Sequence, residues 1–254
     1  MREAIAVGEE RFERLDALRG LAIVWMALFH LCFDLNHFGF IRQDFHNEPL
    51  WTVQRSAIVG LFLFCVGLSQ AVALDGGHDR SAWGGRFWLR WAQIAGCALL
   101  VSLGSWWMFP RSYISFGVLH GIAVILLLLR LAAPAGRWLW LFGLAALLLP
   151  LWFQHEFFDS RWTNWIGLVT AKPITEDYVP LLPWLGVSLW GLAVGQWVLQ
   201  HRPTLLSLPL SPTLRPAARP LACLGRWSLS FYMVHQPVLI GLVAAAAWLV
   251  RTPA

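Results

Sequence analysis

Seven long apolar stretches, separated by short basic or polar segments, dominate this sequence. A helix needs about 20 apolar residues to cross the roughly 30 Å hydrocarbon core of a membrane. The segments that reach or approach this length are 17–37, 51–74, 87–109, 113–131, 137–153, 180–199 and 226–250. Only 13% of the residues are charged, whereas soluble domains carry about 25%. We therefore predict an all-α, polytopic transmembrane helix bundle with about seven spans.

The basic residues are distributed unevenly between the two sides of this predicted bundle. Of the 19 Lys and Arg residues, 13 lie at the N-terminal end of the first span or in the loops that the predicted spans place on the same side of the membrane as the N-terminus. Because basic residues are retained in the cytoplasm, this pattern predicts a cytoplasmic N-terminus and an outer C-terminus, with the chain in a bacterial inner membrane. The sequence has no long Lys/Arg run, so the net charge of +5 does not indicate nucleic-acid binding.

The chain is expected to form one domain over residues 1–254. Residues 1–11 are expected to be a cytoplasmic tail. The segment 201–225 is expected to be a cytoplasmic loop and a poor helix, because it contains five prolines: Pro203, Pro209, Pro212, Pro216 and Pro220.

A polar stripe follows one face of the first span. Helical spacing of three or four residues places these side chains on the same face: Arg19, Ile23, Met26, His30, Asp34 and His37. Ionisable groups inside a span are costly, so this stripe is a candidate functional site. Asp34 lies one turn from His30 and could orient its imidazole, which is the arrangement of a general base.

Two further histidines fall inside spans. Counting about 1.5 Å per residue, His235 lies about 14 Å from the cytoplasmic side and His120 about 10 Å from the outer side. We predict that they reach depths similar to that of His30, although a lone buried histidine is more often a structural hydrogen-bonding group. Gln236 and Pro237 follow His235, and the proline is expected to free a backbone carbonyl one turn earlier.

Two other classes of protein fit a polar chain at mid-membrane. A proton-coupled transporter or binding protein for a small envelope metabolite would use the same buried ionisable groups. Haem or metal ligation by the three histidines is weaker, because no ligand spacing supports it, and we expect no metal. The cysteines Cys32, Cys65, Cys97 and Cys223 include no CxxC pair.

Five segments, in order along nearly the whole chain, resemble motifs of the heparan-α-glucosaminide N-acetyltransferase catalytic-domain family. The first segment opens with Arg14-Leu15-Asp16-Ala17-Leu18-Arg19-Gly20, and the third contains Phe116-Gly117-Val118-Leu119-His120. The full set is 14–23, 62–69, 116–120, 177–184 and 224–235. The resemblance implies a transmembrane acyltransferase that moves an acetyl group from cytoplasmic acetyl-CoA to an amino sugar or glycan on the outer side.

The resemblance also implies roles for individual residues. A catalytic histidine is expected in or after the first span, and the assignment is open among His30, His37 and His46, with Asp34 as the orienting group. As a hypothesis from the residues, His30 either takes a proton from the acceptor or carries the acetyl group itself. The residues expected to hold the donor are Arg19, at its phosphates, with His120, His235 and Gln236; the two histidines either polarise the thioester carbonyl or bind the acceptor. The residues expected to bind the acceptor are Asp177, Tyr178 and Trp184. Expected partners are acyl-CoA, membrane lipid, a sugar or glycolipid acceptor in place of heparan sulfate, and a second copy of the chain as a homodimer.

Overall fold

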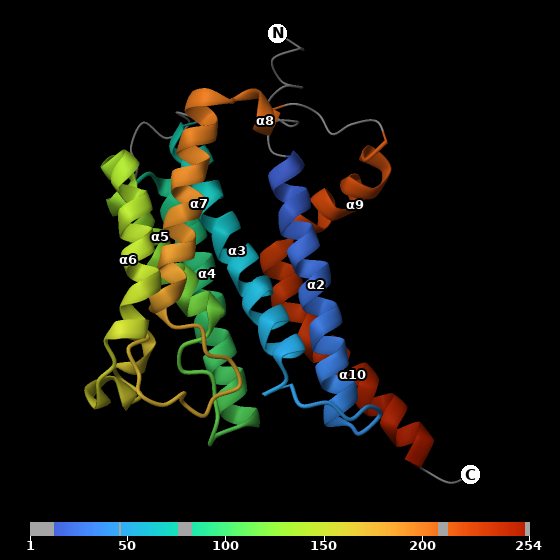
Figure 1. Ribbon diagram of the computed structural model, residues 1–254. Helices are drawn as coiled ribbons and strands as arrows, with labels where there is room; N and C mark the ends of the chain where they lie inside the picture. The colour runs from blue at the N-terminus through green and yellow to red at the C-terminus, as the bar shows by residue number, and fades with distance from the viewer. Residues whose placement is uncertain (1–12, 46, 76–82, 208–212, 252–254) are drawn as a thin grey trace. The chain divides into compact units, whose positions relative to one another are not determined.

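The computed structural model describes residues 13–45, 47–75, 83–207 and 213–251, and it confirms the all-α fold (Figure 1). Seven apolar helices lie where the sequence predicts spans: α2 (Glu13–His37), α3 (Pro49–Asp75), α4 (Gly85–Met108), α5 (Val118–Ala132), α6 (Leu139–Trp152), α7 (Leu181–His201) and α10 (Ser228–Arg251). The shorter elements are η1 (Ala133–Trp138), η2 (Glu156–Asp159), η3 (Asn164–Ile166), α8 (Thr204–Ser207) and α9 (Arg215–Arg226). The predicted tail 1–11 lies outside the described residues.

Six helical stretches in the described ranges are long and apolar enough to cross a membrane. One of them, 118–152, contains α5, η1 and α6. Gly136 in η1 has φ 55°, a conformation that favours glycine, and it separates the two helices. Two contacts with α7 fix the direction of η1 and α6: Gln196 donates to the Ala133 carbonyl, and Trp190 donates to the Trp140 carbonyl. α6 is therefore antiparallel to α7, which agrees with about seven spans.

The fourth span begins later than the sequence predicts. Its helix starts at Val118, five residues after the predicted start. The preceding residues form a loop, and hydrogen bonds with α4 hold it: Ser102 Oγ donates to the Ile114 carbonyl at 2.6 Å, and the Ile114 N–H donates to Ser105 Oγ at 3.0 Å. His120 is consequently the third residue of α5, about 3 Å along the helix axis from its start, and its predicted depth in the membrane stays a prediction.

The chain divides into two compact units, 1–62 with 206–254 and 63–205, and the expectation of a single domain stays a prediction. In the first unit, α2 packs against α9 and α10. Its apolar core contains Met26, Phe29, Phe45 and Ile58. In the second unit, α7 packs against α5 and α6, and the buried Ser188 Oγ donates to the Leu63 carbonyl at 3.0 Å.

The prediction of a poor helix throughout 201–225 is wrong for its last part, where α9 forms. Pro216 lies in the first turn of α9, where a missing N–H removes no helical bond. Close contact with α2 then stabilises the remainder despite Pro220: a Cβ on Gly20 would overlap the Leu221 carbonyl, and one on Gly225 would overlap the Asp16 carbonyl. These glycines let the two backbones touch, which no local pattern in the proline-rich segment indicates.

Candidate functional site

The polar stripe of the first span lies on the buried face of α2, as its spacing predicts. Ile23 and Asp34 are fully buried, and Met26 is almost so. His30 is partly buried, whereas His37, the last residue of the helix, is exposed. The stripe therefore passes from apolar core to a buried carboxyl group and then to the helix end.

The first unit brings His30 together with His235. The centroids of the two imidazole rings are 5.1 Å apart and the ring planes are inclined at 62°. Phe231 stacks on His235 at 5.8 Å, and Phe29 packs edge-on against His30 at 5.9 Å. Aromatic side chains thus surround a pair of imidazoles contributed by α2 and α10.

One hydrogen bond fixes the tautomer of His235. Its Nδ1 lies 2.7 Å from the Tyr232 carbonyl oxygen, one helical turn earlier. A carbonyl only accepts, so Nδ1 carries the hydrogen and Nε2 keeps its lone pair. Pro237 lies inside α10, directly beyond this turn, and the backbone bend expected there stays a prediction.

Asp34 has a different partner from the one that its spacing suggests. Gln236 Nε2 donates to Asp34 Oδ1 at 2.9 Å, across 202 positions of sequence. Among the described residues, no hydrogen bond joins Asp34 to His30. The expectation that Asp34 orients His30 directly is therefore wrong; the carboxylate instead anchors the residue next to His235.

Three buried polar atoms in this cluster have no hydrogen-bond partner within the described parts of the chain: Asp34 Oδ2, His235 Nε2 and Gln236 Oε1. All three are acceptors in the observed arrangement. Buried acceptors are nearly always satisfied, so this cluster suits a ligand rich in hydrogen-bond donors. The described residues include no group of three or more His, Cys, Asp or Glu side chains suited to a metal ion.

His120 lies in the second unit, where both ring nitrogens are engaged. Nδ1 accepts from the Gly117 N–H at 3.2 Å, so Nε2 carries the hydrogen and faces Ser102 Oγ at 3.1 Å. The ring therefore caps the start of α5. A donor molecule could bind His120 only by displacing one of these partners, and its predicted role in donor binding stays a prediction.

Asp177 also caps α5, because its Oδ2 accepts from the Val118 N–H at 2.9 Å. A Cβ on Gly117 would overlap that same carboxylate oxygen. Two of the sequence segments singled out above, 116–120 and 177–184, therefore meet at one helix end. The carboxylate and the positive end of the helix dipole stabilise each other there.

Tyr178 is anchored in the loop before α7. Its hydroxyl donates to the Asn164 carbonyl at 2.7 Å. Burial, and then the negative charge of Asp159, raise the pKa of Tyr178 to about 12. Hydrogen bonds from the Thr170 hydroxyl and backbone N–H lower the pKa of Asp159. Trp184 is partly buried near the start of α7, and acceptor binding by these residues stays a prediction.

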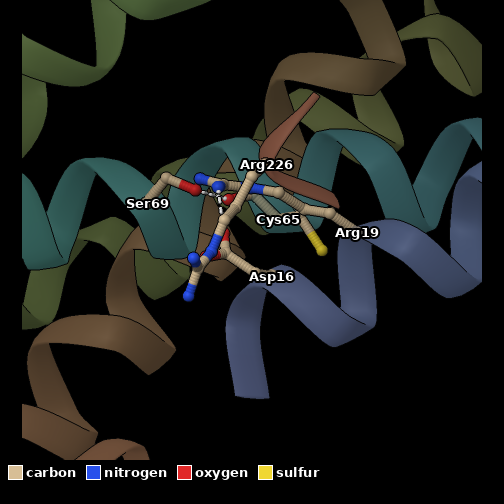
Figure 2. A network of polar contacts seen from close by, with 5 residues as sticks. All are labelled: Asp16, Arg19, Cys65, Ser69 and Arg226. Carbon is tan, nitrogen blue, oxygen red and sulfur yellow. Dashed lines mark hydrogen bonds and ion pairs between the residues drawn. The ribbon is translucent and has the colours of Figure 1, made fainter. Parts of the chain in front are cut away.

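Arg19 belongs to an ionic cluster at the start of α2 that also includes Arg226 (Figure 2). Arg19 Nη1 lies 2.8 Å from Asp16 Oδ1, and Arg226 Nε lies 3.5 Å from Asp16 Oδ2. Two guanidinium groups thus flank one carboxylate, so the three side chains keep a net charge of +1. Sequence reasoning missed Arg226, although it lies in the segment 224–235 that carries the family resemblance.

His46 lies outside the described residues, so its predicted catalytic role stays a prediction. Sequence reasoning also missed the Tyr232 carbonyl and the ring of Phe231. The carbonyl lies three residues before His235, a spacing that any helix offers, so nothing in the sequence distinguished it.

Comparison with curated proteins and with solved structures found no match. A family model, the catalytic part of heparan-alpha-glucosaminide N-acetyltransferase, matches residues 11–237, which is most of the chain. With the apolar helices described above, this match indicates a multi-pass membrane acetyltransferase. The chain belongs to the heparan-alpha-glucosaminide N-acetyltransferase catalytic family.

Proposed function

We propose that this protein transfers an acetyl group from cytoplasmic acetyl-CoA to an amino group of a sugar or glycan on the outer side of a bacterial inner membrane. His30 and His235 carry the proton transfer. The observation that supports this most directly is the state of His235: Nδ1 is held by a backbone carbonyl, and the buried Nε2 has no partner among the described residues.

His235 has the features of a general base. A fixed tautomer keeps the Nε2 lone pair available, as the third member of a catalytic triad does for its histidine. In this chain a backbone carbonyl replaces the usual carboxylate. The neighbouring ring of His30 is close enough to share or relay the proton, directly or through one water molecule.

Asp34 and Gln236 suit the amino group of the acceptor. Gln236 Oε1 can only accept, Asp34 Oδ2 accepts when the carboxyl group is ionised, and a primary amine supplies two donor hydrogens. Both side chains flank the histidine pair in sequence and in space.

The chemistry is a direct acyl transfer. The amine nitrogen attacks the thioester carbonyl carbon, so a C–N bond forms and the C–S bond breaks. The proton lost by the nitrogen passes to His235 Nε2, and from there to the departing sulfur of coenzyme A. Proton transfer of this kind contributes about 10²- to 10⁴-fold to the rate.

The basic cluster at the start of α2 suits the phosphate groups of the donor. Arg19 and Arg226 exceed the charge of Asp16 by one, and the side chain of Arg226 is 56% exposed. Guanidinium groups bind phosphate through paired hydrogen bonds. The positive-inside pattern assigns this end of α2 to the cytoplasm, where acetyl-CoA is available.

The test is acetyl transfer from radiolabelled acetyl-CoA to glucosamine by the purified protein in liposomes. His30→Ala and His235→Ala are expected to lower the rate by about 10²- to 10⁴-fold. His201→Ala is the matched control, because His201 is exposed at the end of α7. Full activity in both site variants would refute the proposed roles.

The same liposomes distinguish the transporter alternative. A proton-coupled carrier would move substrate in response to a pH gradient and would need no coenzyme A. Substrate flux without acetylation, and without any binding of acetyl-CoA, would overturn the proposed enzymatic function.

A further inference from the structure

Asp34 and Gln236 form one hydrogen bond and leave one oxygen each without a partner. Gln236 Nε2 donates to Asp34 Oδ1 at 2.9 Å. The second oxygen of each side chain, Asp34 Oδ2 and Gln236 Oε1, is buried and has no hydrogen-bond partner within the described parts of the chain. Such oxygens are costly, because they have lost water and gained nothing in return. The arrangement therefore calls for a donor that both oxygens can use.

A single proton on Asp34 supplies that donor. A protonated carboxyl group carries one O–H donor. Asp34 Oδ2 can then donate to Gln236 Oε1 while Gln236 Nε2 still donates to Asp34 Oδ1. Both side chains end in planar groups whose last torsion is broad, so a rotation of these groups brings the two remaining oxygens together. The result is a cyclic acid–amide pair with two hydrogen bonds and no unsatisfied oxygen.

The surroundings of Asp34 also favour a neutral side chain. Asp34 is fully buried, and no ion pair joins it to a cationic group among the described residues. Arg226 of α9 lies at the other end of α2, where it pairs with Asp16. A buried carboxylate without a cation is far more costly than a neutral acid. The ionisable groups around Asp34 on α2 and α10 are three histidines: His30, His37 and His235.

We infer that Asp34 and Gln236 hold one proton between them in the free protein, and that an acceptor in its ammonium form enters the site in exchange for that proton. The exchange rests on the proposed function. An ammonium group has three N–H donors, and three buried acceptors are open here: Asp34 Oδ2, Gln236 Oε1 and His235 Nε2. Exchange keeps the net charge of the site constant, whereas an added cation would meet the full cost of burial.

The exchange also balances the protons of the acetyl transfer. An ammonium nitrogen carries three hydrogens and the nitrogen of the acetamide product carries one, so two protons leave it. One passes through His235 Nε2 to the sulfur of coenzyme A, and the other returns to Asp34 and restores its pair with Gln236. The proton released to water on binding is the net proton product. A hydroxyl acceptor brings no charge to exchange, so the site selects amines over hydroxyl groups.

Infrared spectroscopy of the ligand-free protein in liposomes tests the proton on Asp34 directly. A protonated carboxyl group gives a C=O band above the amide I band, and this band shifts when H₂O is replaced by D₂O. We expect such a band near neutral pH in the wild type and its loss in Asp34→Asn. Asp159→Asn is the matched control and is expected to keep the band, because bonds from Thr170 stabilise the ionised form of the exposed Asp159. Identical spectra for the wild type and Asp34→Asn would overturn the inference and leave the role of His235 standing.

Melting temperatures test the second hydrogen bond without requiring activity. Asp34→Asn can form the same cyclic pair, because its Nδ2 can donate to Gln236 Oε1, and it is expected to melt close to the wild type. Asp34→Leu removes both bonds and is expected to melt about 2–12 °C lower. A large rise in Asp34→Asn would show that the wild type buries an unpaired charge, and a fall to the level of Asp34→Leu would show that the second bond does not form. Either result overturns the inference.

Calorimetric titration with glucosamine, in the absence of acetyl-CoA, tests the exchange. At about pH 6 the amino group is protonated, because amines of this kind titrate near about pH 8. Buffers with different ionisation enthalpies then report the protons released: one per glucosamine is expected in the wild type and none in Asp34→Asn. Glucose, which has a hydroxyl group in place of the amine, is expected not to bind.

The titration separates two kinds of failure. Binding of glucosamine without proton release would overturn the exchange and leave the proposed function standing. No binding of glucosamine would refute the proposed acceptor and the exchange together, and the infrared band would still decide whether Asp34 and Gln236 hold a proton.

Discussion

The close contact between α2 and α9 leads us to predict that Gly20→Ala lowers the stability of the protein. An ideal Cβ at Gly20 would overlap the backbone carbonyl oxygen of Leu221. A backbone carbonyl cannot rotate away as a side chain would, so the two helices must separate. Their separation would also strain the second close contact, between Gly225 and Asp16.

Two opposing effects set the magnitude. Alanine in place of a helical glycine stabilises the folded state by about 0.5–1 kcal/mol, because it restricts the unfolded chain. Forcing an extra methyl group into a packed contact costs about 1–3 kcal/mol. We therefore expect a net loss of up to about 2.5 kcal/mol, with a central value of about 1 kcal/mol. For a chain of this size, the melting temperature falls by about 2–4 °C per kcal/mol.

Gly241→Ala is the matched control, because nothing lies within 4 Å of a Cβ at Gly241 in α10. This variant keeps only the favourable backbone effect and is expected to melt slightly above the wild type. Melting in detergent, followed by size-exclusion chromatography of heated samples, measures both. If Gly20→Ala melted at or above the wild-type temperature, the close backbone contact between α2 and α9 would be wrong.

Three further predictions concern the site and the outer loop. Gln236→Leu leaves buried Asp34 without its donor and is expected to cost about 1–3 kcal/mol of stability, seen as a lower melting temperature; an unchanged value would show that the bond to Asp34 contributes nothing. Tyr178 is expected to ionise near pH 12, above its ordinary value of about 10, because burial and nearby charge disfavour the phenolate; the difference in 295 nm absorbance between wild type and Tyr178→Phe measures this, and a transition near pH 10 would contradict the burial. His120→Ala is expected to lower stability by about 1 kcal/mol through loss of the α5 cap at Gly117; an unchanged melting temperature with a raised KM for acetyl-CoA would instead favour donor binding.

The fold class and the approximate positions of the spans could be predicted from the amino-acid sequence. The hydrocarbon core of a membrane requires long apolar helices, and the length and hydropathy of each helix can be determined from its own residues. The buried face of α2 was also predictable, because helical periodicity alone places Ile23, Met26 and Asp34 on one side. The family resemblance of the sequence segments was confirmed over residues 11–237.

The partners of these side chains, in contrast, depend on how the helices pack. Asp34 and Gln236, which form a hydrogen bond, are 202 residues apart in the sequence. The spacing of residues within one helix therefore predicted His30, and could not predict Gln236, as the partner of Asp34. His120 became a helix cap because α5 starts at Val118, a boundary set by a loop that α4 and Asp177 hold in place. α9 forms despite its prolines because Gly20 and Gly225 allow the backbones of α2 and α9 to contact each other. Hydropathy is a property of each residue and predicts which segments lie in the membrane. The partners of a side chain depend on which helices contact each other, and these contacts exist only in the folded chain.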